Sequence, residues 1–432
     1  MANDGGRIEA QAKKAPGRGR SCIFIDMAYS LDELRQRRHF QFFEARRSGG
    51  YFDKVIGLHP LADRVARLNS SIERKRFSEC QDVVEARSAS HGLPVFLRPL
   101  DVLLSQRRLL DYMTGVVRDE KVSLISATDP LYSGLFGLWL KRRTGIPLVI
   151  HLVANFDLNY EATGSLAMPR MFPSRALEKR VIRYVLRKAD LVAAGSETTR
   201  EYAIDQGVAR DRTDVFRVTK NMIAAHRAPP EERRPLTEGE RQQLGIGNSR
   251  KLLLTIARLE RVKMVDQSIL AFSLVAQEHA DAVLLLAGEG SDRDRLERLA
   301  RELGIADRIR FLGLLDQDLL ARLIPGCVAL SPLTGMALAE TSMGGCPAAA
   351  YDCDSSIADL VETGVTGWLL ELGDWKGMGQ AAHRLLSDPA LYKRMSKAMR
   401  KRAENLTDEK VLYAHEHAAF DRLLGPDCTS QP

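Results

Sequence analysis

The sequence predicts an α/β protein made of two Rossmann-like halves, each a doubly wound parallel sheet. Short apolar runs alternate with helical patterns along the 432 residues, as in βαβ units. The runs lack polar alternation, which is typical of parallel strands covered on both faces. A segment rich in Pro and charge at 226–245 separates two series of runs. Each half is long enough to bury its own core.

The first series predicts an N-terminal domain over residues 21–225, preceded by a disordered basic tail at 1–20. Helices are predicted at 31–47 and 176–189, where apolar residues recur with helical spacing. The predicted strands of this half are 21–26, 54–58, 122–127, 147–152, 191–196 and 214–218.

After the predicted linker at 226–245, the second series predicts a C-terminal domain over 246–405. A helix is expected at 291–304, and a last helix at 406–425 that can return to the N-terminal domain. The predicted strands are 251–257, 282–288, 309–313, 327–332, 348–352 and 367–371. Ligands of such sheets bind beyond the carboxyl ends of the strands, here in a cleft where the two domains face each other.

Composition excludes several classes of protein. The six Cys form no CxxC pair, so neither a zinc site nor a disulfide scaffold is expected, and a reducing cytoplasm fits best. No run approaches the roughly 18 apolar residues that span a bilayer. Nor does any group of Asp or His have metal-ligand spacing. We therefore expect no metal and no cofactor.

The net charge of +7 is unevenly distributed. Residues 1–240 contain 40 Lys and Arg against 30 Asp and Glu, whereas the remainder is slightly acidic. An asymmetry of this kind favours an anionic partner, either a membrane surface or nucleic acid. The basic helix at 175–188, with Leu177, Val181 and Val185 on one face, is a candidate for membrane contact; the alternative is that this stripe packs inside the protein.

The densest candidate site is the segment 331–347, where a strand, a Gly-containing turn and an apolar helix follow one another. A helix N-terminus of this kind binds phosphate through its unpaired N–H groups. Glu340, one turn further on, can accept hydrogen bonds from vicinal hydroxyls. Many strand–Gly–helix turns only pack, so this signal alone is weak. The N–H groups concerned belong to Thr334, Gly335, Met336, Ala337 and Leu338.

Two cations follow the strand at 251–257. Arg258 and Lys263 stand just before a helix, and two fixed cations beside a helix N-terminus are suited to holding a diphosphate. Taken alone, they fit a surface pair better. Backbone groups around Gly313 and Leu314 can line a pocket for a flat base.

These pieces together resemble the C-terminal domain of the family-4 retaining glycosyltransferases, which have the GT-B fold. The resemblance extends from Lys251 to about Leu370, through ARLERVKMVD, AGEGSDRDRLERLARELGIADRIRFLG, the turn from Gly335 to Pro347, and ADLVETGVTGWLL. The N-terminal half is similar more loosely, through 129–151 and 186–208.

The resemblance implies roles for particular residues. Arg258 and Lys263 match the pair that grips the donor diphosphate, and Glu340 matches the second Glu of the E-x7-E motif, which holds the ribose. His151 matches the active-site His; the alternative is a core histidine. The first Glu of the motif corresponds to Pro332. In the family this Glu contacts the donor sugar, so the choice of sugar, and activity itself, is open here.

The resemblance therefore implies transfer of a sugar from a UDP- or GDP-sugar, with retention, to a hydroxyl acceptor. The basic N-terminal half favours a glycan or lipid-linked acceptor of the cell envelope. We expect a cytoplasmic protein that can be peripheral on the inner face of the plasma membrane. Asp129 and His59 are candidate acceptor contacts, and Asp129 equally fits a helix cap. The alternatives are a nucleotide-sugar-binding protein without transfer, a phosphorylase or epimerase of the same fold and, ranked last, a nucleic-acid-binding module. The base, sugar, acceptor, linkage and oligomeric state are left open.

Overall fold

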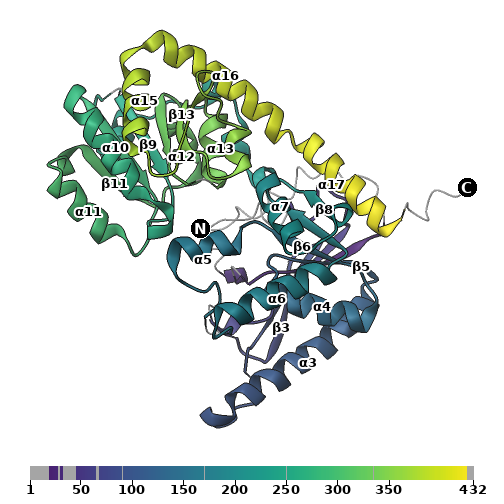
Figure 1. Cartoon of the computed structure of the whole chain (residues 1–432). Coiled ribbons are helices and arrows are strands. Elements are labelled where there is room, and N and C mark those ends of the chain that lie inside the picture. The colour runs from purple at the N-terminus through teal and green to yellow at the C-terminus, as the bar shows by residue number, and fades with distance from the viewer. Residues whose placement is uncertain are drawn as a thin grey trace, which may run out of the picture.

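The computed structural model describes residues 19–27, 30–32, 45–64, 68–89, 91–169, 171–249, 251–333 and 335–425. Most of the predicted basic tail and most of the helix predicted at 31–47 lie outside these residues, as does the end of the chain after Gly425. Thr334 lies outside them as well. The chain forms two parallel-dominated α/β sheets, which lie in separate halves of the molecule (Figure 1).

The first sheet has eight strands in the order β3-β4-β2-β1-β5-β6-β7-β8. Every neighbouring pair is parallel except β3 and β4, which form an antiparallel hairpin at one edge. Its strands are β1 (Ser21–Ile25), β2 (Lys54–His59), β3 (Ile72–Ser78), β4 (Gln81–Ala86), β5 (Val122–Ala127), β6 (Leu148–Leu152), β7 (Leu191–Ala194) and β8 (Thr213–Val215). Its helices are α3 (Arg98–Asp119), α4 (Tyr132–Thr144), α5 (Phe156–Thr163), α6 (Arg175–Lys188) and α7 (Glu197–Asp205).

The hairpin of β3 and β4 has no counterpart among the predicted strands. The strand β3 reads IERKRFS and is only half-buried, because an edge strand presents one side to solvent. Its partner β4 is fully buried but carries Gln81, Asp82 and Glu85. These polar residues interrupt the apolar run that identified the other strands.

The second sheet is wholly parallel, with the strand order β11-β10-β9-β12-β13-β14. Its strands are β9 (Lys251–Ile256), β10 (Ala282–Ala287), β11 (Ile309–Gly313), β12 (Cys327–Ser331), β13 (Ala348–Tyr351) and β14 (Gly367–Leu370). Its helices are α10 (Val265–Glu278), α11 (Arg293–Glu302), α12 (Gln317–Leu323), α13 (Met336–Met343), α14 (Ser355–Ala358) and α15 (Trp375–Ser387). Between the sheets lie α8 (Ala224–Arg227) and α9 (Glu238–Gln243).

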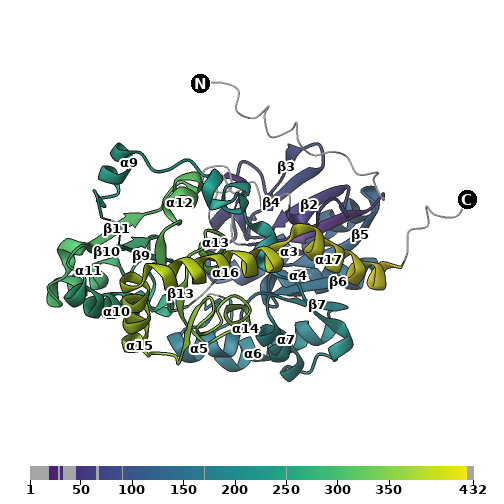
Figure 2. The same ribbon diagram turned by 90° about the horizontal axis from the view of Figure 1, so that it is seen from above.

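Two long helices end the chain, α16 (Pro389–Thr407) and α17 (Glu409–Leu424). Met399 and Ala403 of α16 are buried in the core of the second half, whereas Ala419 and Phe420 of α17 are buried against Tyr51 and Phe52 of the first half. Figure 2 shows the two helices in line across both halves. The chain therefore returns to its first domain.

The carboxyl ends of the two sheets face each other. Ser196, which follows β7, donates a hydrogen bond from Oγ to Asp354 Oδ2 at 3.0 Å, and Asp354 follows β13. Ser355 N donates to Thr198 Oγ1 at 2.9 Å, and Thr198 N donates to Ser355 Oγ at 3.0 Å. Helices α7 and α14 thus meet end to end at their N-termini, each terminus supplying hydrogen-bond acceptors to the other.

Candidate functional site

Four loops meet at the carboxyl edge of the second sheet, because β10, β9, β12 and β13 are consecutive strands. The loop after β9 carries Arg258 and Lys263, and the neighbouring loop after β12 leads into α13 through Gly335. The strand order therefore places the basic pair next to the N-terminus of α13. These residues are 72 or more positions apart in the sequence.

The glycines after β10 allow the basic loop to lie close to the sheet. Leu259 N donates to Glu289 O and Asp292 N donates to Leu259 O, both at 2.9 Å. A Cβ on Gly288, whose φ is +144°, would lie 1.9 Å from Ala257 O, and one on Gly290 would lie 2.2 Å from Leu259 O. Only glycine fits at these two positions, so the AGEG turn sets the path of the backbone that presents Arg258.

The two cations differ in their surroundings. The Arg258 side chain is 68% exposed and forms an ion pair with Glu260 at 2.7 Å. Lys263 lies in a short 3-10 helix, Arg261–Lys263, and forms no ion pair with any described residue. Burial, and after it the charge of Arg258, lowers the pKa of Lys263. An anion placed between them would relieve their mutual repulsion.

Glu340 is a half-buried residue on the first turns of α13. Burial raises its pKa to about 7, and its side chain makes no hydrogen bond with a described residue. The backbone at Gly335 borders open space, since an added Cβ there would meet nothing within 4 Å. A helix N-terminus next to open space suits a phosphate, and a carboxyl group on the following turn suits a hydroxyl.

His151 lies near the carboxyl end of β6. Its Nε2 is hydrogen-bonded to Ser126 Oγ of β5 at 2.7 Å, and its ring contacts Phe24 and Phe216 at centroid distances of 5.5 and 6.2 Å. Burial, and secondarily the charge of Lys220, lowers the pKa of His151 to about 3. The imidazole is therefore neutral at physiological pH and can exchange hydrogen bonds but cannot act as a cation.

The chain brings His151 and Lys263 to the same interface. The helix α5 follows β6 directly, and it contacts the 3-10 helix that contains Lys263. Asn155 begins α5 by accepting hydrogen bonds from Asp157 N at 3.0 Å and Leu158 N at 3.2 Å. This cap fixes the direction in which the chain leaves His151.

The remaining candidates lie around these groups. Asp129 follows β5 and accepts a hydrogen bond from Leu131 N at 2.8 Å, and burial raises its pKa; the carboxyl group is thus engaged at the start of α4. His59 ends β2 and is 4% exposed. Two strands, β1 and β5, separate β2 from β6, so His59 is about 14 Å from the strand of His151 at the usual strand spacing.

In the second sheet, Gly313 ends the outermost strand β11 and adopts a φ of +66°. Its carbonyl accepts a hydrogen bond from Gly288 N at 2.8 Å. Leu314 beside it is 67% exposed. Met336 and Ala337 are half-buried, and Leu338 is buried at 1% exposure. The candidate Thr334 lies outside the described residues, and Pro332 is buried.

Sequence reasoning missed Ser126, Ser196 and Asp354. Ser126 holds the ring of His151, and Ser196 and Asp354 join the two halves. Ser196 begins a capping box with Thr199, a local pattern that can be found in the sequence. The partner of each residue lies in a distant part of the chain, and no local pattern indicates it.

Most of the stripe on α6 packs inside the protein, as the alternative to membrane contact of helix 175–188 predicts. Val181 contacts the core of the first half, and Val185 is buried within it. Arg175 forms ion pairs with Asp157 and with Glu178, the latter at 2.5 Å. Leu177 is 40% exposed, so α6 keeps no continuous apolar face for a lipid surface.

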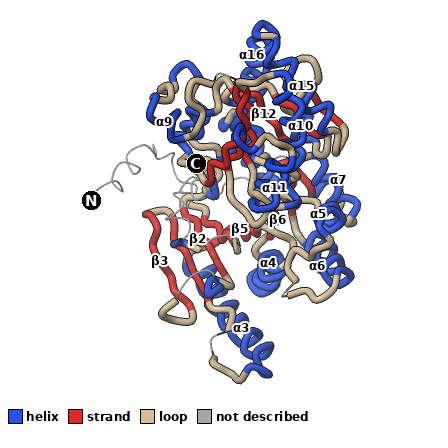
Figure 3. The backbone as a smooth tube through the Cα atoms, turned by 90° about the vertical axis from the view of Figure 1, so that its left-hand side faces the viewer, coloured by secondary structure: helices blue, strands red, loops and turns tan. Residues whose placement is uncertain are grey.

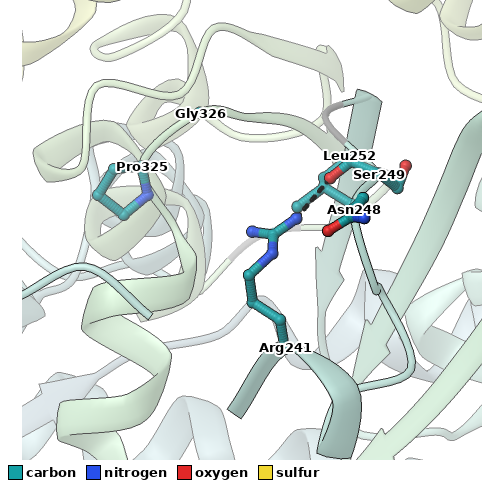
Figure 4. Close-up of a pocket in the computed structure, with 6 residues that line it drawn as sticks. All are labelled: Arg241, Asn248, Ser249, Leu252, Pro325 and Gly326. Carbon is teal, nitrogen blue, oxygen red and sulfur yellow. Dashed lines mark hydrogen bonds between the residues drawn. The ribbon is translucent and has the colours of Figure 1, made fainter. Parts of the chain in front are cut away.

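A pocket lies at the opposite edge of the second sheet (Figure 4). Gly326 precedes β12 and Leu252 is near the start of β9, so this pocket is at the amino ends of the strands. Arg241 Nη2 donates to Ser249 O there at 2.6 Å. The lining residues are Arg241, Asn248, Ser249, Leu252, Pro325 and Gly326.

Within the described part of the chain, no group of three or more His, Cys, Asp or Glu is placed to hold a metal ion. No described helix combines the length and apolar character that crossing a bilayer requires.

Comparison with known proteins yields two family models. The model described as glycosyl transferases group 1 matches residues 237–402, and the glycosyl transferase 4-like domain matches residues 58–219.

Among curated proteins, N-acetyl-alpha-D-glucosaminyl L-malate synthase of Bacillus anthracis is 31% identical over 189 residues, covering 42% of this chain and 49% of the relative. Alpha-monoglucosyldiacylglycerol synthase of Streptococcus pneumoniae is 26% identical over 202 residues, which cover 46% of this chain and 44% of the relative. The match thus spans about half the length of these relatives.

Solved structures agree over nearly the whole chain. HepE of Anabaena, in complex with UDP and glucose, has a TM-score of 0.66 at 17% identity and covers 93% of this chain and 100% of its own. Sucrose-phosphate synthase of Thermosynechococcus elongatus has a TM-score of 0.70 at 17% identity, and the match covers 94% of this chain and 99% of the synthase. At this identity the likeness concerns the fold.

Proposed function

This chain belongs to the group 1 glycosyltransferases of the family-4 type, and we propose that it transfers a sugar from a UDP- or GDP-sugar to a hydroxyl acceptor, with retention at the anomeric carbon. The observation that carries the proposal is the adjacency of β9 and β12, which places Arg258 and Lys263 beside the N-terminus of α13 and Glu340. Cations, a helix N-terminus and a carboxyl group match the diphosphate and ribose of such a donor.

In the proposed reaction, the bond between the anomeric carbon and the diphosphate breaks while the acceptor hydroxyl attacks from the same face. The departing phosphate oxygen takes the acceptor proton, so no protein nucleophile is needed. Arg258, Lys263 and the N-terminus of α13 would stabilise the negative charge that develops on the diphosphate. Because His151 is neutral, its role would be to orient a sugar hydroxyl through a hydrogen bond.

The acceptor is proposed to be a cell-envelope glycan or a lipid-linked intermediate. The curated relatives include a synthase of a glucosyldiacylglycerol and a poly(glycerol-phosphate) glucosyltransferase, and the first half of this chain is basic. Asp129 and His59 border the first sheet at the edge that would receive the acceptor. As part of the same proposal, the protein lies in the cytoplasm and attaches to the inner face of the plasma membrane.

One observation favours a second candidate, a protein that binds a nucleotide-sugar without transferring it. Pro332 replaces the carboxylate that contacts the donor sugar in the similar family, and it is buried. This candidate predicts donor binding with no release of free nucleotide in the presence of any acceptor.

Thermal unfolding with UDP, GDP, ADP and their sugar conjugates tests the donor site. A ligand at about 100 times its Kd adds roughly 2.7 kcal/mol of stability, which raises Tm by several degrees. We expect one base family to give this shift. Glu340→Ala is expected to weaken nucleotide binding by roughly 1.5–3 kcal/mol, which removes about half or more of the shift at the same ligand concentration. Glu302→Ala, an exposed substitution on α11, is the matched control. A shift of equal size in Glu340→Ala would refute the assignment of Glu340.

A further inference from the structure

The first turns of α3 have their polarity inverted relative to an ordinary surface helix. Leu100, Leu103 and Leu104 are 45%, 62% and 39% exposed. On the opposite side of the same turns, Ser105 and Gln106 are buried. An exposed apolar cluster backed by buried polar residues calls for an explanation, whereas a single exposed leucine does not.

The buried polar side chains explain why the leucines stay outside. Asp101 accepts a hydrogen bond from His91 N at 2.8 Å and contacts His91 Nδ1 at 3.1 Å. Gln106 Nε2 donates to Pro60 O at 3.2 Å. These contacts attach one face of α3 to the loops of the first half, so a rotation that buried the leucines would break them.

The topology places this apolar cluster at the carboxyl edge of the first sheet. Strands β4 and β5 run in the same direction and α3 connects them, so the helix begins at the edge where the strands end. Its 22 residues extend about 33 Å, against about 20 Å for the six residues of β5. The first turns of α3 therefore project beyond the sheet, as Figures 1 and 3 show. His151 and Asp129 belong to this edge.

The tip, defined as residues 96–104, combines apolar side chains with nearby positive charge. Phe96 and Leu97, which precede α3, are 80% and 36% exposed. Arg107 and Arg108 are exposed on the next turn and form no ion pair with a described residue. Asp101, the one acidic residue between Phe96 and Arg108, is buried. Within the tip itself, Arg98 is the exposed charged residue. The exposed charge from Phe96 to Arg108 is thus entirely positive.

The spacing along the helix matches the depth profile of a lipid surface. Arg107 follows Leu100 by seven residues, or about 10 Å of helix. Interfacial helices bury their apolar side chains about 5–10 Å deep, while arginines reach the anionic headgroups. Leu100, Leu103 and Leu104, followed by Arg107 and Arg108, have the apolar and cationic layers in that order. Arg98, exposed at the start of the helix, would extend its long side chain along the surface to bring its guanidinium to the headgroups.

We propose that the tip of α3 inserts into the surface of an anionic lipid bilayer and holds the acceptor edge of the first sheet against it. Docking to the bilayer does not depend on the proposed transfer reaction. The idea that the bilayer supplies the acceptor does rest on that proposed function. A second copy of the chain fits this surface poorly, because a two-fold contact would bring Arg107 and Arg108 of both copies together.

Co-sedimentation of the full chain with vesicles tests the proposal, without any nucleotide. We expect binding to vesicles of phosphatidylcholine with 30% phosphatidylglycerol, and much weaker binding to phosphatidylcholine alone or at high salt. The substitutions L100S, L103S and L104S together are expected to lower the partition coefficient more than 100-fold, at about tenfold for each inserted leucine. Arg107→Ser with Arg108→Ser is expected to lower it about 25-fold, at about fivefold for each arginine.

Matched controls carry the same changes elsewhere. Leu303→Ser with Leu372→Ser alters leucines that are 37% and 59% exposed in the second half, and Arg298→Ser with Arg301→Ser alters exposed arginines of α11. Both controls should bind vesicles like the wild type, and all variants should keep its Tm.

Three results would overturn the proposal. The first is no binding of the wild type to anionic vesicles, and the second is equal binding by the tip and control variants. The third is a dimer in solution that the leucine substitutions dissociate, which would assign the surface to a second copy. The nucleotide-dependent rise in Tm is measured separately, so failure of docking and failure of the donor site are distinguishable.

Discussion

At the scale of single residues, Arg258 is the most informative position for the proposed chemistry. Its guanidinium is exposed and held by Glu260, so its removal should leave the fold intact. We expect Arg258→Ala to lower kcat by about 10²–10³-fold with little change in donor KM, because the lost interaction acts on charge that develops in the transition state. Steady-state kinetics with varied donor measures this split.

The neighbouring Arg261 is the matched control for Arg258. It lies on the same loop, its side chain is 83% exposed, and its nearest carboxylate, Asp292, is 4.0 Å away. Arg261→Ala should retain kcat within a factor of about two. Equal losses in the two variants would mean that the loop contributes only general positive charge.

Glu340 predicts a pH dependence of stability. Its pKa is raised by burial to about 7 in the folded protein, from 4.5, so the native state binds the proton more tightly than the unfolded state. The contribution of the protonated Glu340 carboxyl group to the free energy of unfolding is fully present below pH 4.5. It is lost as the pH rises to 7, and this loss amounts to at most about 3 kcal/mol. Glu340→Gln should abolish this loss.

Urea unfolding of the wild type and Glu340→Gln at pH 5 and pH 8 measures this effect. The variant is expected to be less pH-sensitive, and to gain stability relative to the wild type at pH 8. Identical pH dependence in both proteins would show that the carboxyl group is solvated in the folded state.

At the scale of elements, the glycines after β10 support the loop that carries Arg258. The side chain of Gly288→Ala would collide with Ala257 O, and the φ of +144° is unfavourable for alanine. We expect a loss of about 2–3 kcal/mol together with weaker nucleotide binding, since the loop must move. Gly239→Ala on α9, where an added Cβ would meet nothing within 4 Å, should change neither property.

Unfolding and nucleotide titration together separate these outcomes. A stable Gly288→Ala variant with unchanged donor affinity would show that the loop after β9 adapts without the glycine. A variant that is both less stable and weaker in binding would confirm that the AGEG turn acts through the loop beside it.

At the scale of the whole molecule, α17 joins the end of the chain to the first half. Phe420 is 4% exposed and contacts Tyr51 and Phe52 at ring-centroid distances of 5.3 and 5.5 Å. Lys220 and Ser48 both bind Glu416, the latter at 2.6 Å. Phe420→Ala is expected to cost about 3–5 kcal/mol.

Calorimetry reports where this loss falls. The transition of the first half should move to lower temperature, because Phe420 packs against that sheet. Val411→Ala, a substitution at a 61% exposed position of the same helix, should leave it unchanged. A uniform shift of a single transition would instead show that the two halves unfold as one unit.

Most strands and helices could be predicted from the sequence, because each is indicated by the residues within and next to it. The runs KLLLTI and AVLLLA read as buried strands and are β9 and β10. The charged hairpin of β3 and β4 was missed because its burial comes from partners on the sheet rather than from its own apolar content. For the stripe on α6, the sequence left membrane contact and internal packing open, and only its neighbours reveal that Val185 is buried.

By itself, the sequence determined the order of every strand except β3 and β4, the division into two halves and the cations that follow β9. Those properties depend on neighbouring residues and on the periodicity of apolar side chains. Tertiary structure alone decided that His151 is neutral, that the pKa of Glu340 is raised, that Ser196 meets Asp354, and that the leucines of α3 point outward. These depend on burial by groups distant in the chain, and desolvation and hydrogen bonding act only once folding has brought those groups together.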